Sequence, residues 1–213
     1  MSKVFFLVSV SLDGYLVPPG MDLDHACDFA YEDWGAQWGK LQSWLLATRF
    51  FRETLKLGEG GDTGHDHRIA EQTFRRTGVS IMGRRMFDLG ERMWPEEAPF
   101  HTPVFVLTSQ VRKPWVRPGG TTFHFVHDGI ESALRQARAA AGDRDIRIAG
   151  GANVIQQYLR AGLVDEFSLA ISPVMFGGGE RLFAGISRDV GVELVETIAS
   201  PRTTHVRYAV HKL

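Results

Sequence analysis

The chain has 213 residues, of which 44% are hydrophobic and 23% are charged, and its formal net charge is −1. These values are typical of a globular protein with one sizeable hydrophobic core. A net charge near zero gives no electrostatic reason to expect a nucleic acid or an anionic membrane as partner. Because Cys27 is the only cysteine, no internal disulfide can form, and a reducing, cytoplasmic setting is favoured. The apolar run 4–10 is too short to span a bilayer.

The first predicted element is a central strand over residues 4–12, which ends at the turn Asp13-Gly14. Residues 20–64 follow as an aromatic-rich insertion, in which two tryptophans four residues apart predict a helix. Two interpretations of this insertion stay open. It is either an extra helix that packs on the core or a lid whose aromatic side chains stack on a planar heterocycle.

Metal binding is not expected from the polar residues of this region. His65 and His67 face opposite ways on a helix and no third ligand pattern follows, so the sequence predicts the solvated start of a helix. The acidic run 22–28 lacks the glycine and the final glutamate of a calcium-binding loop.

The middle of the chain predicts a helix over 69–76 and a short strand over 79–82, which ends at Gly83. Arg84 and Arg85 then stand at the start of another predicted helix. Guanidinium groups in that place suit bidentate binding of phosphate. The alternative is an exposed basic turn.

Two further strands are predicted over 103–107 and 122–126, and Thr108 and Ser109 leave the first of them. A start that resembles a capping box at 128–131 predicts the next helix. A hairpin follows at the C-terminus, with strands over 192–198 and 206–210. The chain shows no repeats or linkers, so residues 1–213 are predicted to form a single domain.

The most informative stretch is residues 146–172, which predict a strand, a turn at Gly150-Gly151, a helix and a second strand. Gly162 occupies the position of a left-handed helix cap. A turn without side chains in front of a helix N-terminus suits a phosphate group. The alternative is a tight turn that only allows close packing. The spacing departs from G-x-G-x-x-G, so a standard Rossmann domain is disfavoured.

Four predicted strand ends therefore carry small or phosphate-suited residues. In an α/β sheet, ligands bind outside the carboxyl ends of the strands. We therefore expect a single nucleotide site built from Asp13-Gly14, Gly83-Arg84-Arg85, Thr108-Ser109 and Gly150-Gly151.

In the order of its motifs the chain resembles the dihydrofolate-reductase-like superfamily. It is most similar to the branch that includes the reductase domain of the bifunctional riboflavin-biosynthesis deaminase/reductase. The motifs that carry this resemblance are Ser11–Gly14, Ile81–Phe87, Pro103–Thr108, Ala149–Val154, Ala161–Glu166 and Pro173–Phe183. The resemblance implies an α/β three-layer sandwich, with a mixed, mainly parallel central sheet flanked by helices and a C-terminal antiparallel hairpin. It also implies NADPH as hydride donor.

The resemblance also assigns residues to the cofactor. Arg84, Arg85 and Ser109 would bind the 2′-phosphate, and Gly83 and Thr108 flank them. The residues that would bind the pyrophosphate or lie beside it are Gly150, Gly151, Ala152, Asn153 and Val154. A cis Gly150–Gly151 peptide is a feature to check.

The substrate half of the resemblance is less specific. Met86 stands where dihydrofolate reductases commonly have threonine, and their substrate carboxylate corresponds to one of Asp28, Glu32 and Asp33. Asp13 is the first candidate for a polar substrate contact or a catalytic acid, and its alternative role is to cap the Gly14 turn. Glu180 is the second candidate, with a structural turn as its alternative.

The sequence thus predicts an NADPH-dependent reductase of a pterin, a folate or a ribosylaminopyrimidine-like heterocycle. The single cysteine excludes the zinc deaminase domain of the bifunctional enzyme. The competing hypothesis is a non-catalytic nucleotide-binding module that keeps the fold. A flavin- or F420-dependent reductase is a third, which the paired arginines disfavour. A homodimer is also expected.

Overall fold

The computed structural model describes residues 2–20 and 32–211, with the backbone alone at Glu32 and Asp33. Its helices are α1 Glu32–Leu41, α2 Ser43–Leu46, α3 Arg49–Thr54, α4 His65–Arg76, α5 Arg84–Met93, α6 Ile130–Ala141 and α7 Ala152–Arg160. Its strands are β1 Val4–Ser11, β2 Tyr15–Val17, β3 Thr77–Gly83, β4 Pro103–Leu107, β5 Trp115–Val116, β6 Thr122–Val126, β7 Asp145–Gly150, β8 Glu166–Ser172, β9 Glu180–Arg181, β10 Gly191–Ala199 and β11 Thr204–His211.

The main sheet has nine strands in the order β10-β11-β8-β1-β7-β3-β4-β6-β5. The six strands from β8 to β6 are parallel, and β11, β10 and β5 are antiparallel to their neighbours. A separate two-stranded ribbon pairs β2 with β9. This arrangement confirms the predicted mixed, mainly parallel sheet with a C-terminal antiparallel hairpin.

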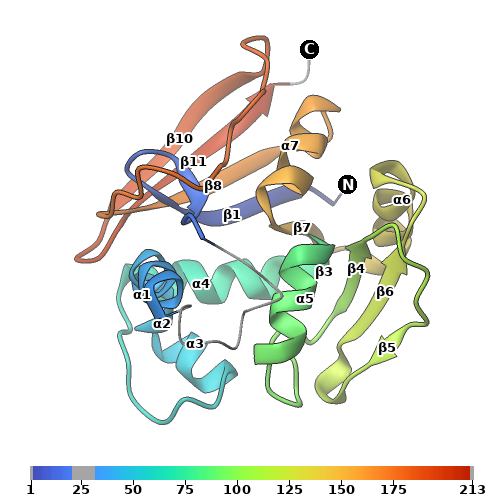
Figure 1. Cartoon of the computed structure of the whole chain (residues 1–213), viewed down its shortest axis with the longest axis horizontal. Helices are drawn as coiled ribbons and strands as arrows, with labels where there is room; N and C mark the ends of the chain where they lie inside the picture. The colour runs from blue at the N-terminus through green and yellow to red at the C-terminus, as the bar shows by residue number, and fades with distance from the viewer. Residues whose placement is uncertain (1, 21–31, 212–213) are drawn as a thin grey trace.

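Helices cover both faces of the sheet, as Figure 1 shows. Strand β1 illustrates why: its alternate side chains are buried on opposite faces. Phe6 and Val8 pack into a cluster with apolar residues of α6 and α7, whereas Leu7 packs with Trp44 of α2 and Ala70 of α4. A third cluster joins α5 to β3, β4 and β6. The result is the predicted three-layer α/β sandwich.

Several local predictions need correction. Residues 15–17, for which no separate strand was predicted, form β2, which the preceding turn carries away from β1 to pair with β9. The short strand β5 was missed. The N-cap of α6 is Gly129, and no side chain caps it, so the expected capping box does not form there.

The insertion folds in its described part into three short helices. Trp44 is fully buried, and its indole Nε1 donates to Ser9 Oγ at 2.8 Å. The one aromatic residue of α2 therefore packs on the sheet. Of the predicted features, Cys27, Asp28 and the acidic run 22–28 lie outside the described residues. No described helix combines the length and apolar character needed to cross a membrane.

Candidate active site

The carboxyl ends of three parallel strands meet at one edge of the sheet. Gly83 at the end of β3 pairs with Leu107 at the end of β4, and Met82 pairs with Gly150 at the end of β7. This register brings three of the expected loops side by side. We call residues Gly83–Arg85, Thr108–Ser109 and Gly150–Val154 the strand-end site.

Close packing explains two of the glycines in this site. A Cβ added to Gly83 would lie 2.9 Å from Val154 Cγ2, so the start of α7 can approach β3 only because Gly83 has no side chain. Gly150 has φ +131°, a conformation that favours glycine, and an added Cβ would lie 3.3 Å from Met86 Sδ. The Gly150–Gly151 peptide is cis. The paired glycines and the arginine motif are therefore neighbours.

Gly151 differs from these two glycines, because the protein itself leaves its surroundings open. Its φ is −80°, which any residue can adopt, and an added Cβ would meet no described atom within 4 Å. Gly151 is also the N-cap of α7. Space without a side chain therefore lies directly in front of a helix N-terminus.

Both helices that begin at this edge lack a side-chain N-cap. Gly83 caps α5 and Gly151 caps α7, and in neither helix does a described side chain accept a hydrogen bond at the cap. The first turns contain no acidic residue. Exposed N–H groups and the positive end of the helix dipole favour an anion at such positions.

The two arginines have different partners. Arg84 Nε donates to Asp88 Oδ2 at 3.0 Å, one turn along the same helix, and its side chain is 45% exposed. Arg85 Nη1 donates to Glu180 Oε1 of β9, which is distant in sequence. Arg85, which was expected to bind phosphate, is thus paired with Glu180, the second candidate for a substrate contact or a catalytic acid.

The remaining cofactor candidates make only local contacts. Thr108 Oγ1 accepts a hydrogen bond from Gln110 N at 3.1 Å, and Ser109 is exposed. Asn153 is also exposed, and its Oδ1 accepts from Gln157 Nε2 at 2.7 Å. Ala152 is buried at the start of α7.

The Asp13 carboxylate is bound at the turn after β1. It accepts hydrogen bonds from Ser11 Oγ at 2.6 Å and from the backbone amides of Phe176 and Gly177 at 3.2 and 2.7 Å. The bond from Ser11, helped by those from the two amides, lowers the pKa of Asp13 to about 2. Asp13 is therefore ionised near neutral pH. That state suits anchoring of the 176–177 loop and does not suit a proton donor.

The β2–β9 ribbon is held against α7 by a residue that the sequence interpretation missed. Gln156 is buried on α7, and its Nε2 donates to the carbonyls of Arg181 and Leu182 at 2.9 and 3.1 Å. The available signal was a glutamine next to the apolar positions of a predicted helix. A Cβ added to Gly179 would collide with the Val17 carbonyl oxygen, so the ribbon strands are closely apposed.

A second polar cluster lies between α4 and the C-terminal hairpin. Asp66 is buried, which corrects the expectation of a fully solvated helix start. Its carboxylate contacts His205 Nε2 at 2.7 Å and accepts from Ser200 Oγ at 3.0 Å. Burial lowers the pKa of His205, and the bond to Asp66 opposes this effect in part. Across residues 2–20 and 32–211, no three histidine, cysteine or acidic side chains are grouped to hold a metal ion.

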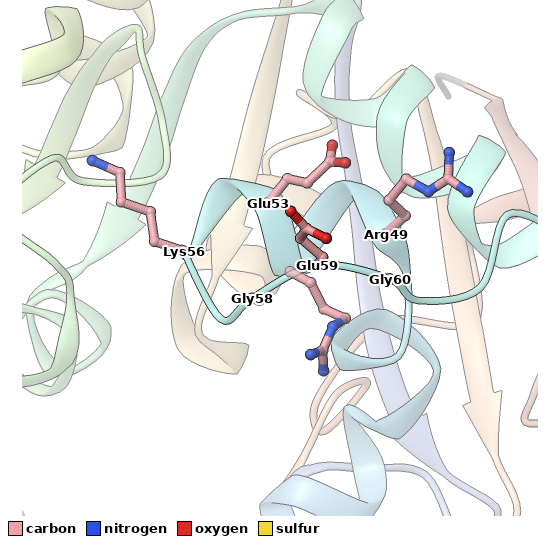
Figure 2. Close-up of a pocket in the computed structure, with 7 residues that line it drawn as sticks. Arg49, Glu53, Lys56, Gly58, Glu59 and Gly60 are labelled. Atoms are coloured by element: carbon pink, nitrogen blue, oxygen red, sulfur yellow. The ribbon is translucent and has the colours of Figure 1, made fainter.

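A surface hollow of about 630 Å³ lies beside α3 (Figure 2). Its lining mixes both signs of charge: Arg49, Arg52, Glu53, Lys56, Gly58, Glu59 and Gly60. No residue of the strand-end site lines it. The hollow is therefore separate from the expected nucleotide site.

Comparison with known proteins identifies the family. Residues 2–206 match the RibD C-terminal domain. The chain belongs to this family. Members of the RibD C-terminal domain family are of reductase type, which agrees with the resemblance seen in the motifs.

Sequence relatives of this RibD C-terminal domain protein match it over shorter stretches. The uncharacterized protein YyaP of Bacillus subtilis (strain 168) is 36% identical over 73 residues, which is 34% of this chain and 38% of YyaP. The uncharacterized protein YwjB of the same organism is 25% identical over 84 residues, or 39% of this chain and 48% of YwjB. The chain thus matches less than half the length of each relative.

Solved structures share the fold over almost the whole chain. A protein assigned to riboflavin biosynthesis from Shewanella sp. PV-4 has a TM-score of 0.64 at 21% identity, covering 99% of both chains. The deaminase/5-amino-6-(5-phosphoribosylamino)uracil reductase of Thermotoga maritima has a TM-score of 0.55 at 13% identity, covering 99% of this chain and 57% of that one. The dihydrofolate reductase of Enterococcus faecalis, complexed with NADP(H), has a TM-score of 0.53 at 14% identity, covering 98% of this chain and 96% of that one.

Proposed function

We propose that this protein is an NADPH-dependent reductase of a heterocyclic substrate, either a pterin or folate or a ribosylaminopyrimidine-like compound. One observation carries the proposal. The open space at Gly151 lies in front of the α7 N-terminus and beside the α5 N-terminus, with Arg84 at the start of α5. This combination suits a ligand with more than one phosphate group.

The residues present fit the nucleotide. The N-terminal amides of α7, with Gly150, Gly151 and Ala152, would hold the pyrophosphate. Arg84, Arg85 and Ser109 would bind the 2′-phosphate, with Gly83 and Thr108 shaping the turn and Asn153 and Val154 at the rim of the site. NADPH would supply a hydride to the substrate, while the protein orients both and excludes water.

Asp13 and Glu180 remain the candidates for substrate contact. The ionised state of Asp13 favours a role in positioning the 176–177 loop and a polar substrate group. The organisation of residues 1–213 as one domain, the homodimer and the cytoplasmic setting stay predictions.

The first test is cofactor discrimination. Arg84→Ala should weaken NADPH binding about tenfold or more, since a hydrogen bond to a charged group contributes roughly 1.5–3 kcal/mol, and should leave NADH almost unchanged because NADH has no 2′-phosphate. Nicotinamide fluorescence during titration measures both affinities. Arg138→Ala, on the exposed side of α6, is the control and should change neither. Equal losses for both nucleotides would contradict the assignment of Arg84.

Catalysis is tested separately with a substrate panel. A reductase should oxidise NADPH, followed at the nicotinamide absorbance, with at least one pterin, folate or ribosylaminopyrimidine. The non-catalytic module predicts tight binding of NADPH and no oxidation with any of these compounds.

A further inference from the structure

The ion pair between Arg85 and Glu180 crosses the end of strand β7. Arg85 belongs to α5, which follows β3, and Glu180 belongs to the ribbon that continues from β1 and β8. In the sheet order, β7 lies between β1 and β3. The pair therefore joins the two sides of the strand that ends at Gly150, next to the strand-end site.

The ribbon partner of Arg85 is held in place independently of the ion pair. Leu182 N donates to the Gly14 carbonyl at 3.2 Å, and Gln156 of α7 donates to the carbonyl of Arg181. Glu180 thus stands on a segment anchored to the turn after β1 and to α7. The Arg85 side chain is 58% exposed and that of Glu180 is 34% exposed, so both groups are accessible to a ligand at this edge.

A carboxylate and a phosphate compete for the same guanidinium, because both accept its parallel N–H groups. Arg84 does not face this competition from another element, since its partner Asp88 is on the same helix. This competition opposes binding of the 2′-phosphate and does not concern a nucleotide that lacks this group.

We infer that Glu180 is a specificity-determining residue that limits the preference for NADPH over NADH by holding Arg85. The inference rests on the proposed function, because it concerns the same nucleotide site. It separates the roles of the two arginines. Arg84 binds the 2′-phosphate directly, and Arg85 contributes only to the extent that Glu180 releases it.

The test is a double-mutant cycle on nucleotide affinity. Glu180→Gln keeps the size of the side chain and removes its charge, so it should tighten NADPH binding up to about fivefold, the range of a part-exposed ion pair, with NADH unchanged. In the Arg85→Gln background the same substitution should have no effect on either nucleotide. Glu196→Gln on β10 is the matched control and should leave both affinities unchanged. Fluorescence titration gives the affinities, and thermal unfolding confirms that each variant is folded.

Two outcomes would overturn the inference. Unchanged affinities for both nucleotides in Glu180→Gln show that Glu180 has no role in specificity. An equal change for both nucleotides shows that Glu180 only shapes the ribbon. If Glu180→Gln does not fold, Glu180→Ala replaces it in the test. The single variant Arg85→Gln then gives a second measurement: because Glu180 holds Arg85, this variant should lose less NADPH affinity than Arg84→Ala does. If the unmodified protein binds neither nucleotide, the proposed function is overturned as well. If it binds NADPH but the double-mutant cycle shows no effect of Glu180→Gln, only the inference is overturned.

Discussion

Single glycines at the sheet edge serve different purposes, and the structure separates them. Gly83 has no room for a side chain, because Val154 packs against it. Gly151 has room and an ordinary φ, so contacts within the protein do not require glycine at that place. Gly151 therefore leaves space through which a ligand can reach the N-terminus of α7.

These two glycines should respond differently to alanine. Gly83→Ala forces Val154 and the start of α7 to move, and overpacking of this kind costs about 1–3 kcal/mol. Gly151→Ala should lose much less stability and should weaken NADPH binding, because the added methyl group enters the space in front of α7. Urea unfolding and fluorescence titration measure the two effects.

Gly39→Ala on α1 is the matched control, since an added Cβ there meets no described atom within 4 Å. Alanine replaces glycine within a helix at that position, so stability should rise slightly with no change in nucleotide affinity. If Gly151→Ala bound NADPH as tightly as the unmodified protein, the pyrophosphate would have to be placed elsewhere.

At the scale of elements, helix α4 is attached to the sheet at both of its ends. Near its C-terminus Arg76 donates to Asp145 of β7 at 2.6 Å and to Glu166 of β8 at 2.7 Å, and its guanidinium lies over the Phe5 ring. Lys3 donates to the same Glu166 at 2.6 Å. This network ties together the starts of three neighbouring strands.

Loss of the network should therefore destabilise the sheet. Arg76→Met keeps much of the apolar contact with Phe5 and removes the charge, and we expect a loss of about 1–3 kcal/mol from charged hydrogen bonds that are partly buried. Arg202→Met removes a more exposed pair with Asp62, at 3.3 Å, and should cost no more than about 0.5 kcal/mol. Urea denaturation of both variants checks the difference, and similar losses would show that burial does not matter here.

For the whole molecule, the burial of His205 makes stability depend on pH. Burial lowers the pKa of His205 in the folded protein below the ordinary value of 6.5. Between the two values the unfolded chain binds more protons than the folded one, so acid favours unfolding. The stabilisation is complete above about pH 6.5 and is lost as the pH falls through that value toward the folded pKa.

The prediction is a lower free energy of unfolding at pH 5.5 than at pH 7.5, measured in urea. His205→Gln removes this titrating group and should reduce the dependence, leaving the part that comes from His124, whose pKa burial also lowers. His211→Gln changes an exposed histidine and should retain it. Asp13 acts in the same direction at lower pH, because its stabilisation is present above pH 3.8 and is lost as the pH falls toward 2. A flat profile in the unmodified protein between pH 5.5 and 7.5 would contradict the role of His205.

The arrangement of elements could be derived largely from local patterns. The apolar run of β1, the alternation along β8 and β11 and the helical spacing in α7 reflect which side chains must be buried, and burial follows the geometry of each element. Gly162, with φ +64°, ends α7 as expected. The glycines that end β3 and β7 were recognised for the same reason, since a strand end without side chains is a feature of a few consecutive residues.

Which polar side chains pair with each other could be seen only in the folded chain. Arg85 and Glu180 are 95 positions apart, and Asp66 and His205 are 139 apart, so no local pattern joins them. A long or buried polar side chain pairs with whatever the packing of helices on the sheet places within reach. Residue periodicity therefore determined the layers and the edge where the candidate site lies, and helix geometry alone brings Arg84 within reach of Asp88, four residues later. Only tertiary packing decided that Arg85 is held by the ribbon, because Glu180 comes from a distant part of the sequence.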